Sequence, residues 1–575
     1  MATCLIILSQ ILKCKGEKMD FKQIIEDSIK NKEYTNVKDL LQAARPGFGD
    51  YCLPCFSYSK QFKKSPVDIA NDIKLSVDSP YIEKTEVVNG YLNFYLSKKE
   101  IAKNVLLSPV NLTSDKNSGK VMCIDYSSVN LAKYMHIGHL ATTMIGESIA
   151  RLYEATGYKV VRINYIGDYG TPFGKIITAY KLWGNEEDVK KRGIDALQEL
   201  YVKFCANEET NPELMDMARE EFRKIEENEP ETHALYEKII NIAKDEVYDL
   251  TNMLGIKFDS WRGESYYSDK MEAVVDELKQ KNLVKISEGA LVCDLTDYNL
   301  GMCLIKKSDG TSLYTTRDIA AAEDRFKDYN YDESIYVTAV QQKQHFASFF
   351  KVLELMNKPY ANRLKHVYYG MIALPNGKIA SRKGKQAIVR DILTEALEKA
   401  GEVIKDRDFT EEEKENVTKT VAMGAVTFCV LKNERIKDNI FDLEKALSFD
   451  GETAPYMQYT YARCSSILRN AKEYDFNSVE YNFDCLNDEN AFEIIKYINN
   501  FKDIIMLAQE KCEPSIVSKA CLDICALVNK YYHDTKILNP DNLSQTKTKL
   551  LLIDKVRNVI KTGLNLIVID TVEKM

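Results

Sequence analysis

The sequence of 575 residues lacks any run of about 18 apolar residues, the length that a membrane-spanning helix needs. Its first 12 residues are apolar around Leu5–Leu8, but they have neither a basic leader nor a small-residue cleavage site, so they do not match a secretory signal. Met19 makes a better start, and we expect residues 1–18 to be an extension or disordered. We expect a cytoplasmic protein with no membrane partner.

Paired cysteine motifs are also scarce. The 14 cysteines are scattered, and Cys52 and Cys55 form one C-x-x-C with no second pair nearby to complete a four-ligand zinc site. A plain structural role and free thiols in a reducing cytosol fit this pattern, and no metal-ligating residues are predicted. The net charge of −8 gives no basic excess, but a basic patch can lie on an acidic protein, so RNA is neither indicated nor excluded.

The composition, with 45% hydrophobic and 29% charged residues, is that of an ordinary globular protein, and the length allows several domains. Residues 19–112 predict a small α+β module with helices beginning at Phe21 and spanning Pro66–Leu75. The segment Val87–Leu96 predicts a hairpin that turns at Asn89-Gly90. This module holds no obvious catalytic cluster and is interpreted as a packing or docking unit.

Residues 113–395 predict an α/β domain. Strand Val121–Ile124, helix Leu140–Tyr153 and strand Tyr158–Asn164 imply a parallel pair with a right-handed crossover. A charged helical insertion is expected at about 184–254. The sheet is expected to resume afterwards, with strand-like segments at Leu291–Leu295, Met302–Ile305 and Ser334–Val340.

Residues 396–575 predict an all-helical bundle. Four segments show the 3.6-residue periodicity of amphipathic helices: Tyr461–Ala471, Phe492–Ala508, Ile516–Tyr532 and Thr546–Leu566. The fold class expected for the whole chain is therefore multidomain α/β, with a small α+β N-terminal domain, a Rossmann-like domain built on a parallel sheet, and an all-α C-terminal bundle.

The segment Lys133–His139 joins the first predicted strand to its helix and ends in His-Ile-Gly-His. A helix N-terminus offers free N–H groups to a phosphate, and Gly138 removes a side chain where a nucleotide could lie. His136 and His139 are three residues apart and could donate hydrogen bonds to the same phosphate. The alternative is two surface histidines near a helix start, and a matching cationic loop or a substrate pocket would decide between them.

Such a loop follows at Pro375–Lys385, which contains an Asn-Gly turn. Its four cations within eight residues are Lys378, Arg382, Lys383 and Lys385. Taken alone it could be a solvated basic turn. Together with the upstream histidines it favours a triphosphate site in which the loop holds the leaving pyrophosphate.

With these motifs the chain resembles the class I aminoacyl-tRNA synthetases, and specifically the arginyl-tRNA synthetases. His136–His139 is similar to the HIGH motif and Gly167–Gly174 to the arginyl GDWGTQFG. Further segments that resemble the arginyl family are Ser127–Lys133, Leu313–Asp318, Gln342–Phe346, Gly451–Tyr456 and Glu573–Met575. The resemblance covers nearly everything from Met19 onward.

The chain departs from the family pattern in a few places. At the KMSKS position, Lys378-Ile379-Ala380-Ser381-Arg382 lacks the second lysine, which leaves Arg382, Lys383 and Lys385 as candidates for its role. Val129 stands where proline is usual, and Tyr169 and Pro172 stand where tryptophan and glutamine are usual.

The resemblance implies that arginine and ATP form arginyl-adenylate, which is then transferred to the 3′-terminal adenosine of tRNA(Arg), with Mg²⁺ neutralising phosphate charge. The catalytic residues it implies are His136, Gly138, His139, Lys378, Arg382 and Lys383. The ATP-binding residues it implies are His136, Gly138, His139, Asp168, Lys378, Ser381 and Arg382.

A guanidinium is planar with five donors, so its pocket should offer carboxylates in that plane. By resemblance these carboxylates are Asp125 and Asp318. The full arginine-binding set that the resemblance implies is Asp125, Ser127, Asn130, Lys133, Tyr314, Asp318 and Gln342. Without the family pattern, Asp125 would be interpreted as a strand-end acid facing solvent, and Asp318 as half of a surface ion pair with Arg317.

The family pattern further implies that the bundle binds the anticodon region and the N-terminal module the tRNA elbow. Candidate stacking and phosphate contacts are Lys432, Tyr456, Tyr459, Tyr461 and Arg463; the alternative is that some of them are bundle core. A monomer is expected, and so is arginine activation that requires bound tRNA. Two rival interpretations are a nucleotidylyltransferase, which is usually shorter and lacks the bundle, and a catalytically silent paralogue that only binds tRNA.

Overall fold

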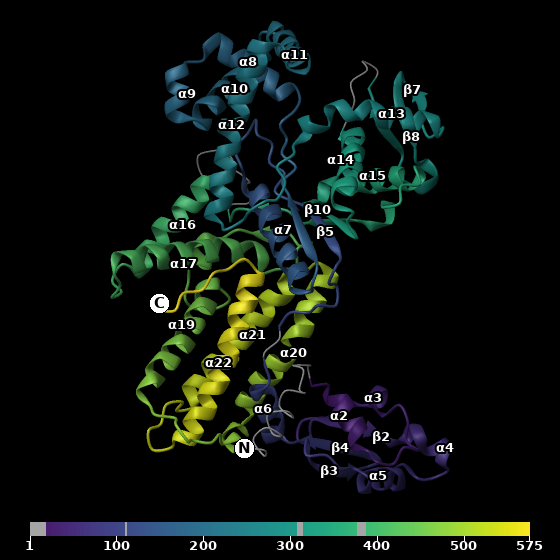
Figure 1. The fold of residues 1–575 in the computed structure, drawn as a ribbon, viewed down its shortest axis with the longest axis vertical. Helices are drawn as coiled ribbons and strands as arrows, with labels where there is room; N and C mark the ends of the chain where they lie inside the picture. Colours follow the sequence, from purple (N-terminus) through teal and green to yellow (C-terminus); the bar gives the residue numbers. More distant parts are fainter. Residues whose placement is uncertain (1–18, 110–111, 308–313, 376–386) are drawn as a thin grey trace, which may run out of the picture.

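The computed structural model describes residues 19–109, 112–307, 314–375 and 387–575. The N-terminal module, a central α/β region and a helical bundle succeed one another along the chain, and the insertion helices stand at the opposite end of the molecule from the N-terminal module (Figure 1). A single hydrophobic core cluster runs through the module, one face of the central sheet and the bundle. The expected fold class is confirmed.

The N-terminal module is a four-stranded antiparallel sheet in the order β1-β2-β4-β3, covered by short helices. The hairpin was predicted correctly: Asn89 and Gly90 turn with φ of 50° and 80°. The elements are β1 (Gln42–Ala43), β2 (Tyr51–Pro54), β3 (Ile82–Val88), β4 (Tyr91–Leu96), α2 (Phe21–Ser28), α3 (Val37–Leu40), α4 (Ser59–Phe62), α5 (Pro66–Leu75) and α6 (Lys98–Leu107).

The central sheet is parallel throughout, in the order β11-β10-β5-β6. Its strands are β5 (Val121–Asp125), β6 (Lys159–Ile163), β10 (Glu333–Ala339) and β11 (Leu364–Tyr369). The predicted β5–helix–β6 unit is confirmed, with α7 (Ile137–Ala155) as the crossover. Because the chain leaves β5 on one side and returns through β10 on the other, the strand order reverses between β5 and β10, and ligands of such sheets bind at the carboxyl ends of the strands there.

Two of the strands predicted for the central sheet lie in a separate sheet. β7 (Lys285–Ser287), β8 (Ala290–Asp294) and β9 (Met302–Lys306) form a separate antiparallel sheet, so the prediction that the central sheet resumes here was wrong. The physical reason is visible in β9, where exposed and buried residues alternate; a parallel strand covered on both faces is apolar along its whole length. This sheet packs beside α13 (Met271–Gln280), α14 (Tyr314–Tyr329) and α15 (Lys343–Leu355) (Figure 1).

The insertion helices are α8 (Thr171–Trp183), α9 (Glu186–Arg192), α10 (Ile194–Glu208), α11 (Glu213–Glu226) and α12 (Pro230–Met253). They are tied to the centre through Asp195, which accepts hydrogen bonds from the Tyr134 hydroxyl at 2.7 Å and from Arg390 at 2.6 Å.

The C-terminal helices are α16 (Val389–Ile404), α17 (Glu411–Leu431), α18 (Leu443–Ala446), α19 (Ala454–Asn470), α20 (Glu489–Lys511), α21 (Ser515–Asp534) and α22 (Leu543–Leu566). The four predicted bundle helices are confirmed as α19 to α22, although α19 begins earlier than expected. Strands β12 (Ile372–Ala373) and β13 (Asn439–Ile440) pair across the junction with the central α/β region. The expected domain limits remain predictions, and the one after residue 395 falls inside α16.

The sheet and the bundle are joined through α7. Ser148 donates from its hydroxyl to the Leu566 carbonyl at 2.7 Å, and Arg151 donates to the Asn565 carbonyl at 2.8 Å. The helix that begins at the histidine loop therefore ends against α22. Within the described ranges, every helix is too short or too polar to cross a membrane.

Candidate active site

The two histidines cap the helix that follows them. His136 is the N-cap of α7, and its Nδ1 accepts the Gly138 N–H at 3.1 Å, while His139 Nδ1 accepts the His136 N–H at 3.2 Å. Because both Nδ1 atoms accept, each neutral ring carries its proton on Nε2. The rings stack with centroids 3.8 Å apart. A Cβ on Gly138 would lie 3.0 Å from the His136 ring, so a larger residue would displace that ring.

Both rings are neutral near pH 7. Burial lowers the pKa of His139 to about 3, and burial together with the Lys133 charge lowers the pKa of His136. The pair can therefore offer two Nε2–H donors to an anion without carrying charge of its own.

The cationic loop falls outside the described residues, including Lys378, Ser381, Arg382 and Lys383, but both of its flanks contact the histidine loop. Upstream, the Tyr369 hydroxyl donates to the Gly138 carbonyl at 2.9 Å. Downstream, the Ile137 N–H donates to the Ala387 carbonyl at 3.1 Å, and the Val389 N–H donates to the Met135 carbonyl at 2.8 Å. The described residues on either side of the cationic loop thus lie against the histidine loop.

Asp125 lies at the carboxyl end of β5 and is buried rather than facing solvent. Its Oδ2 forms an ion pair with Arg325 at 2.8 Å, and its Oδ1 accepts the Ser128 hydroxyl at 2.8 Å. The Arg325 guanidinium lies 5.1 Å from the Tyr165 ring and 5.5 Å from the Tyr336 ring. Burial raises the pKa of Asp125 and the Arg325 charge opposes that rise. The solvent-facing alternative for Asp125 is wrong.

Asp318 does not pair with its neighbour in sequence. Its Oδ2 lies 2.6 Å from His345 Nε2, while Arg317 forms an ion pair with Glu264 at 2.6 Å and covers the Tyr169 ring. The alternative of an Arg317–Asp318 surface pair is therefore wrong. Tyr314 is the first residue of α14, and its side chain lies outside the described structure.

Glu264 was missed by the sequence reasoning. Burial, with Asp318 and Asp168 nearby, raises the pKa of Glu264 to about 7 although Arg317 opposes the rise. Its segment runs beside β6, where Ser260 bridges Ile163. The Gly-Glu-Ser around it was the only sequence signal, and nothing local indicates that it lies near α14.

Asp168 uses both carboxylate oxygens on Ser265, at 2.8 Å to its N–H and 2.7 Å to its hydroxyl. Gly263 permits this approach, since a Cβ there would lie 2.4 Å from the Asp168 carboxylate. The carboxylate thus fixes the segment that carries Glu264, and its expected contact with ATP stays a prediction.

The other expected pocket residues lie around the same strand ends. Ser127 is buried with φ of 72°, Lys133 is exposed, and Gln342 is exposed just after β10. Asn130 pairs with Gly167 in a parallel bridge, and its Oδ1 accepts the Ala132 N–H at 3.0 Å. Among the described residues, the buried hydroxyl of Tyr165 has no hydrogen-bond partner and lies close enough to Asp318 and Glu264 for their charges to raise its pKa.

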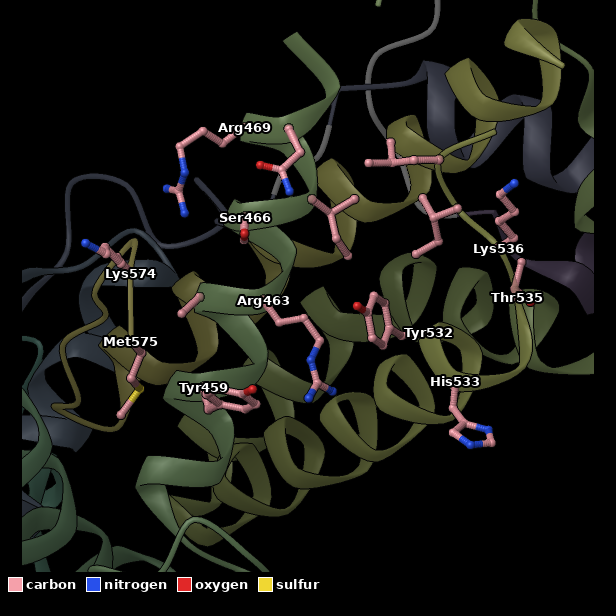
Figure 2. A pocket seen from close by; sticks show the side chains of 15 residues that line it. Tyr459, Arg463, Ser466, Arg469, Tyr532, His533, Thr535, Lys536, Lys574 and Met575 are labelled. Carbon is pink, nitrogen blue, oxygen red and sulfur yellow. The ribbon is translucent and has the colours of Figure 1, made fainter. Parts of the chain in front are cut away.

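A second candidate site lies in the bundle, where α19, α21 and the chain end enclose a groove of about 670 Å³ (Figure 2). Arg463 lies between two rings, 4.8 Å from Tyr459 and 4.9 Å from Tyr532. Figure 2 shows Lys574 and Met575 at the edge of the same groove. We call this the bundle groove.

The remaining candidate stacking and phosphate contacts differ in their burial. Tyr461 is core: it is buried, and its hydroxyl donates to Glu573 at 2.6 Å. Tyr456 is half-buried, and Lys432 is exposed at the end of α17 beside a smaller cavity. The alternative that some candidates are bundle core thus holds for Tyr461.

In the described ranges, no group of three or more His, Cys, Asp or Glu side chains is arranged to hold a metal ion.

Comparisons with known proteins fit this geometry. A family model described as the catalytic domain of "tRNA synthetases class I (R)" matches residues 101–443. A DALR anticodon-binding domain matches residues 457–575, and an arginyl-tRNA synthetase N-terminal domain matches residues 19–96. Together the sheet, the histidine loop and the helical bundle define a class I aminoacyl-tRNA synthetase.

Curated relatives narrow the class. Proteins named arginine–tRNA ligase from Clostridium perfringens and Halothermothrix orenii are 40% and 41% identical, each over 97% of this chain and 100% of the relative. The solved Thermus thermophilus arginyl-tRNA synthetase, 24% identical, has the same fold with a TM-score of 0.76 over 97% of this chain and 100% of that one. The chain belongs to the arginyl-tRNA synthetase family.

Proposed function

We propose that the protein ligates L-arginine to tRNA(Arg) with ATP, by way of arginyl-adenylate. The observation that carries the proposal is that two neutral histidine donors follow β5, while a set of buried and half-buried carboxylates lies around the carboxyl ends of the same parallel strands. The histidine donors suit a phosphate, and the carboxylates suit a guanidinium.

In the first step an arginine carboxylate oxygen attacks the α-phosphorus of ATP, and the bond to pyrophosphate breaks. Because the substrate supplies the nucleophile, the protein contributes position and charge stabilisation. His136 and His139 donate through Nε2–H to the phosphate oxygens as negative charge builds up. Lys378 and the cations Arg382 and Lys383 hold the leaving pyrophosphate.

The guanidinium binds among carboxylates at the ends of β5, β6 and α14. Asp318 keeps one oxygen free of His345, and Glu264 lies beside it, so a planar fork has acceptors on more than one side. Asp125 pairs with Arg325 and Ser128, and its expected contact with the guanidinium stays a prediction. An ammonium cannot use two such acceptors in one plane, which favours arginine over lysine.

In the second step the terminal ribose hydroxyl of the tRNA attacks the arginyl carbonyl, and AMP leaves. The bundle groove receives anticodon bases, which stack on Tyr459 and Tyr532 with Arg463 between them. The N-terminal module contacts the tRNA elbow. Bound tRNA is required before arginine is activated.

Mg²⁺ is proposed to arrive with ATP, as part of the nucleotide substrate, and to neutralise phosphate charge. The protein is proposed to act as a cytoplasmic monomer.

The test is aminoacylation of total tRNA with each of the twenty labelled amino acids, ATP and Mg²⁺, using the wild type and His139→Ala. Charging by arginine alone, lost by about 10²-fold or more in the variant, supports both substrate and site. Charging by a different amino acid refutes the carboxylate pocket. Bound tRNA without charging identifies the silent paralogue instead.

A further inference from the structure

Two carboxylates of the proposed arginine pocket are each held by a basic side chain of the protein itself. Asp125 pairs with Arg325, and both side chains are almost fully buried, at 6% and 3% exposed. Asp318 pairs with His345, and these side chains are 18% and 30% exposed. The first pair is sealed from solvent, whereas the second is open to ligand and solvent and contains a histidine.

His345 lies in the first turn of α15, which is separated from β10 by the short turn Val340–Gln342. Its ring makes an edge contact with Phe346, with centroids 5.4 Å apart, and stacks on Phe349 at 6.4 Å. Its Nε2 lies 2.6 Å from Asp318 Oδ2, a short contact typical of a charge-assisted hydrogen bond. This places the imidazole against one oxygen of Asp318 only.

We propose that His345 is a positioning residue that fixes Asp318 through Oδ2, turns Oδ1 toward the arginine guanidinium, and weakens arginine binding when it takes up a proton. The proposal rests on the proposed function, since it concerns the pocket of that reaction. His345 itself does not touch the reacting atoms.

The direction of the pH dependence follows from the charges of His345 and Asp318. A neutral His345 donates Nε2–H and leaves Asp318 with its full negative charge for the substrate. A protonated His345 cancels that charge, and the guanidinium then loses its attraction to Asp318. Burial lowers the pKa of His345, but the hydrogen bond to Asp318 and the Asp318 charge outweigh it, so the pKa lies above its usual value. Affinity for arginine should therefore fall as the pH drops through that pKa.

Other titratable and charged groups lie around the Asp318–His345 pair. Glu264, with a pKa of about 7, titrates in the same range and contributes its own loss of affinity at low pH. His366, on the adjacent strand β11, has its pKa lowered to about 4 by burial and by His345, Arg435 and Lys343, so it stays neutral. Arg317 forms its ion pair with Glu264, at 2.6 Å, whereas His345 pairs with Asp318.

The experiment measures the arginine KM and the ATP KM by tRNA-dependent pyrophosphate exchange between pH 5.5 and 8, with the full chain. His345→Gln keeps a donor but cannot titrate, and His345→Ala removes the contact. We expect His345→Ala to raise the arginine KM by about tenfold or more, the factor lost with a hydrogen bond to a charged group, with the ATP KM unchanged. In His345→Gln the arginine KM stays near the wild-type value at pH 8 and rises less steeply on acidification.

His233→Gln is the matched control, because His233 lies on α12 and its ring is 4.0 Å from an acid, Glu237, outside the proposed arginine pocket. It should keep the wild-type pH profile. An unchanged arginine KM in His345→Ala, an equal rise in both KM values, or a wild-type pH profile in His345→Gln would overturn the proposal. If His345→Ala does not fold, the pH dependence of the arginine KM in His345→Gln decides. A wild type that exchanges no pyrophosphate with arginine would instead refute the proposed function.

Discussion

At the scale of single residues, the pair of Asp125 and Arg325 carries the strongest prediction about stability. Removing one partner of a buried ion pair leaves an unpaired charge and costs about 3–5 kcal/mol, whereas replacing both partners can be close to neutral. We therefore expect Arg325→Met to lower the midpoint of urea unfolding markedly. The double variant with Asp125→Asn should recover much of that loss.

The matched control is Arg262→Met, which removes a more exposed arginine from two acids on the same helix, Asp324 and Asp328. Such pairs contribute about 1 kcal/mol or less, so its urea midpoint should change little. Equal losses in Arg325→Met and Arg262→Met would show that the buried pair has no special role.

Single-residue patterns also set the limit of what could be predicted. The histidine pair was predictable because both residues lie within one turn of a helix start, where local geometry decides their hydrogen bonds. The partners of Asp125 and Asp318 were not, because Arg325 and His345 reach them from other elements. Tertiary contacts of this kind leave no trace in sequence spacing, and Glu264 was missed for the same reason.

At the scale of elements, the histidine loop is held between α7 and the start of α16. The bond from the Val389 N–H to the Met135 carbonyl, 2.8 Å long, fixes the exit of the cationic loop. Val389 is the first residue of α16, where proline is tolerated, and Ile388 before it is already extended. Val389→Pro therefore removes this hydrogen bond while leaving the helix able to form.

We expect Val389→Pro to lower kcat/KM for ATP by about fivefold, the value of one hydrogen bond of about 1 kcal/mol. Val389→Ala keeps the N–H and reports the loss of side-chain packing alone. The measurement is pyrophosphate exchange at varied ATP. If the two variants lose the same activity, the backbone bond does not position the loop.

The elements themselves were predicted unevenly. Helices with a clear apolar stripe, such as α20 and α22, were found close to their true bounds because periodicity over many residues is a strong signal. β11 was missed because its sequence, Leu-Lys-His-Val-Tyr-Tyr, is neither continuously apolar nor regularly alternating. β8 and β9 were found as strands but assigned to the wrong sheet, since a short strand does not encode its partner.

At the scale of the whole molecule, α7 connects the histidine loop of the proposed active site to the helical bundle. Its first residues hold the histidine pair, and Ser148 and Arg151 further along it bond to the end of α22. The bundle groove lies between α19 and α21 of the same bundle. The groove is therefore joined to the histidine loop by a continuous set of packed helices, and this route supports the proposal that activation depends on tRNA.

The proposed dependence of activation on tRNA can be tested at the bundle groove. Arg463→Ala removes the guanidinium between Tyr459 and Tyr532, and losing one stacked contact of about 1–3 kcal/mol should raise the tRNA KM by about 5- to 150-fold. The tRNA concentration for half-maximal pyrophosphate exchange should rise by the same factor, while the arginine KM at saturating tRNA stays unchanged. Lys519→Ala, at an exposed position of α21 outside the groove, is the control. Exchange that proceeds at full rate without tRNA would show that groove and pocket act independently.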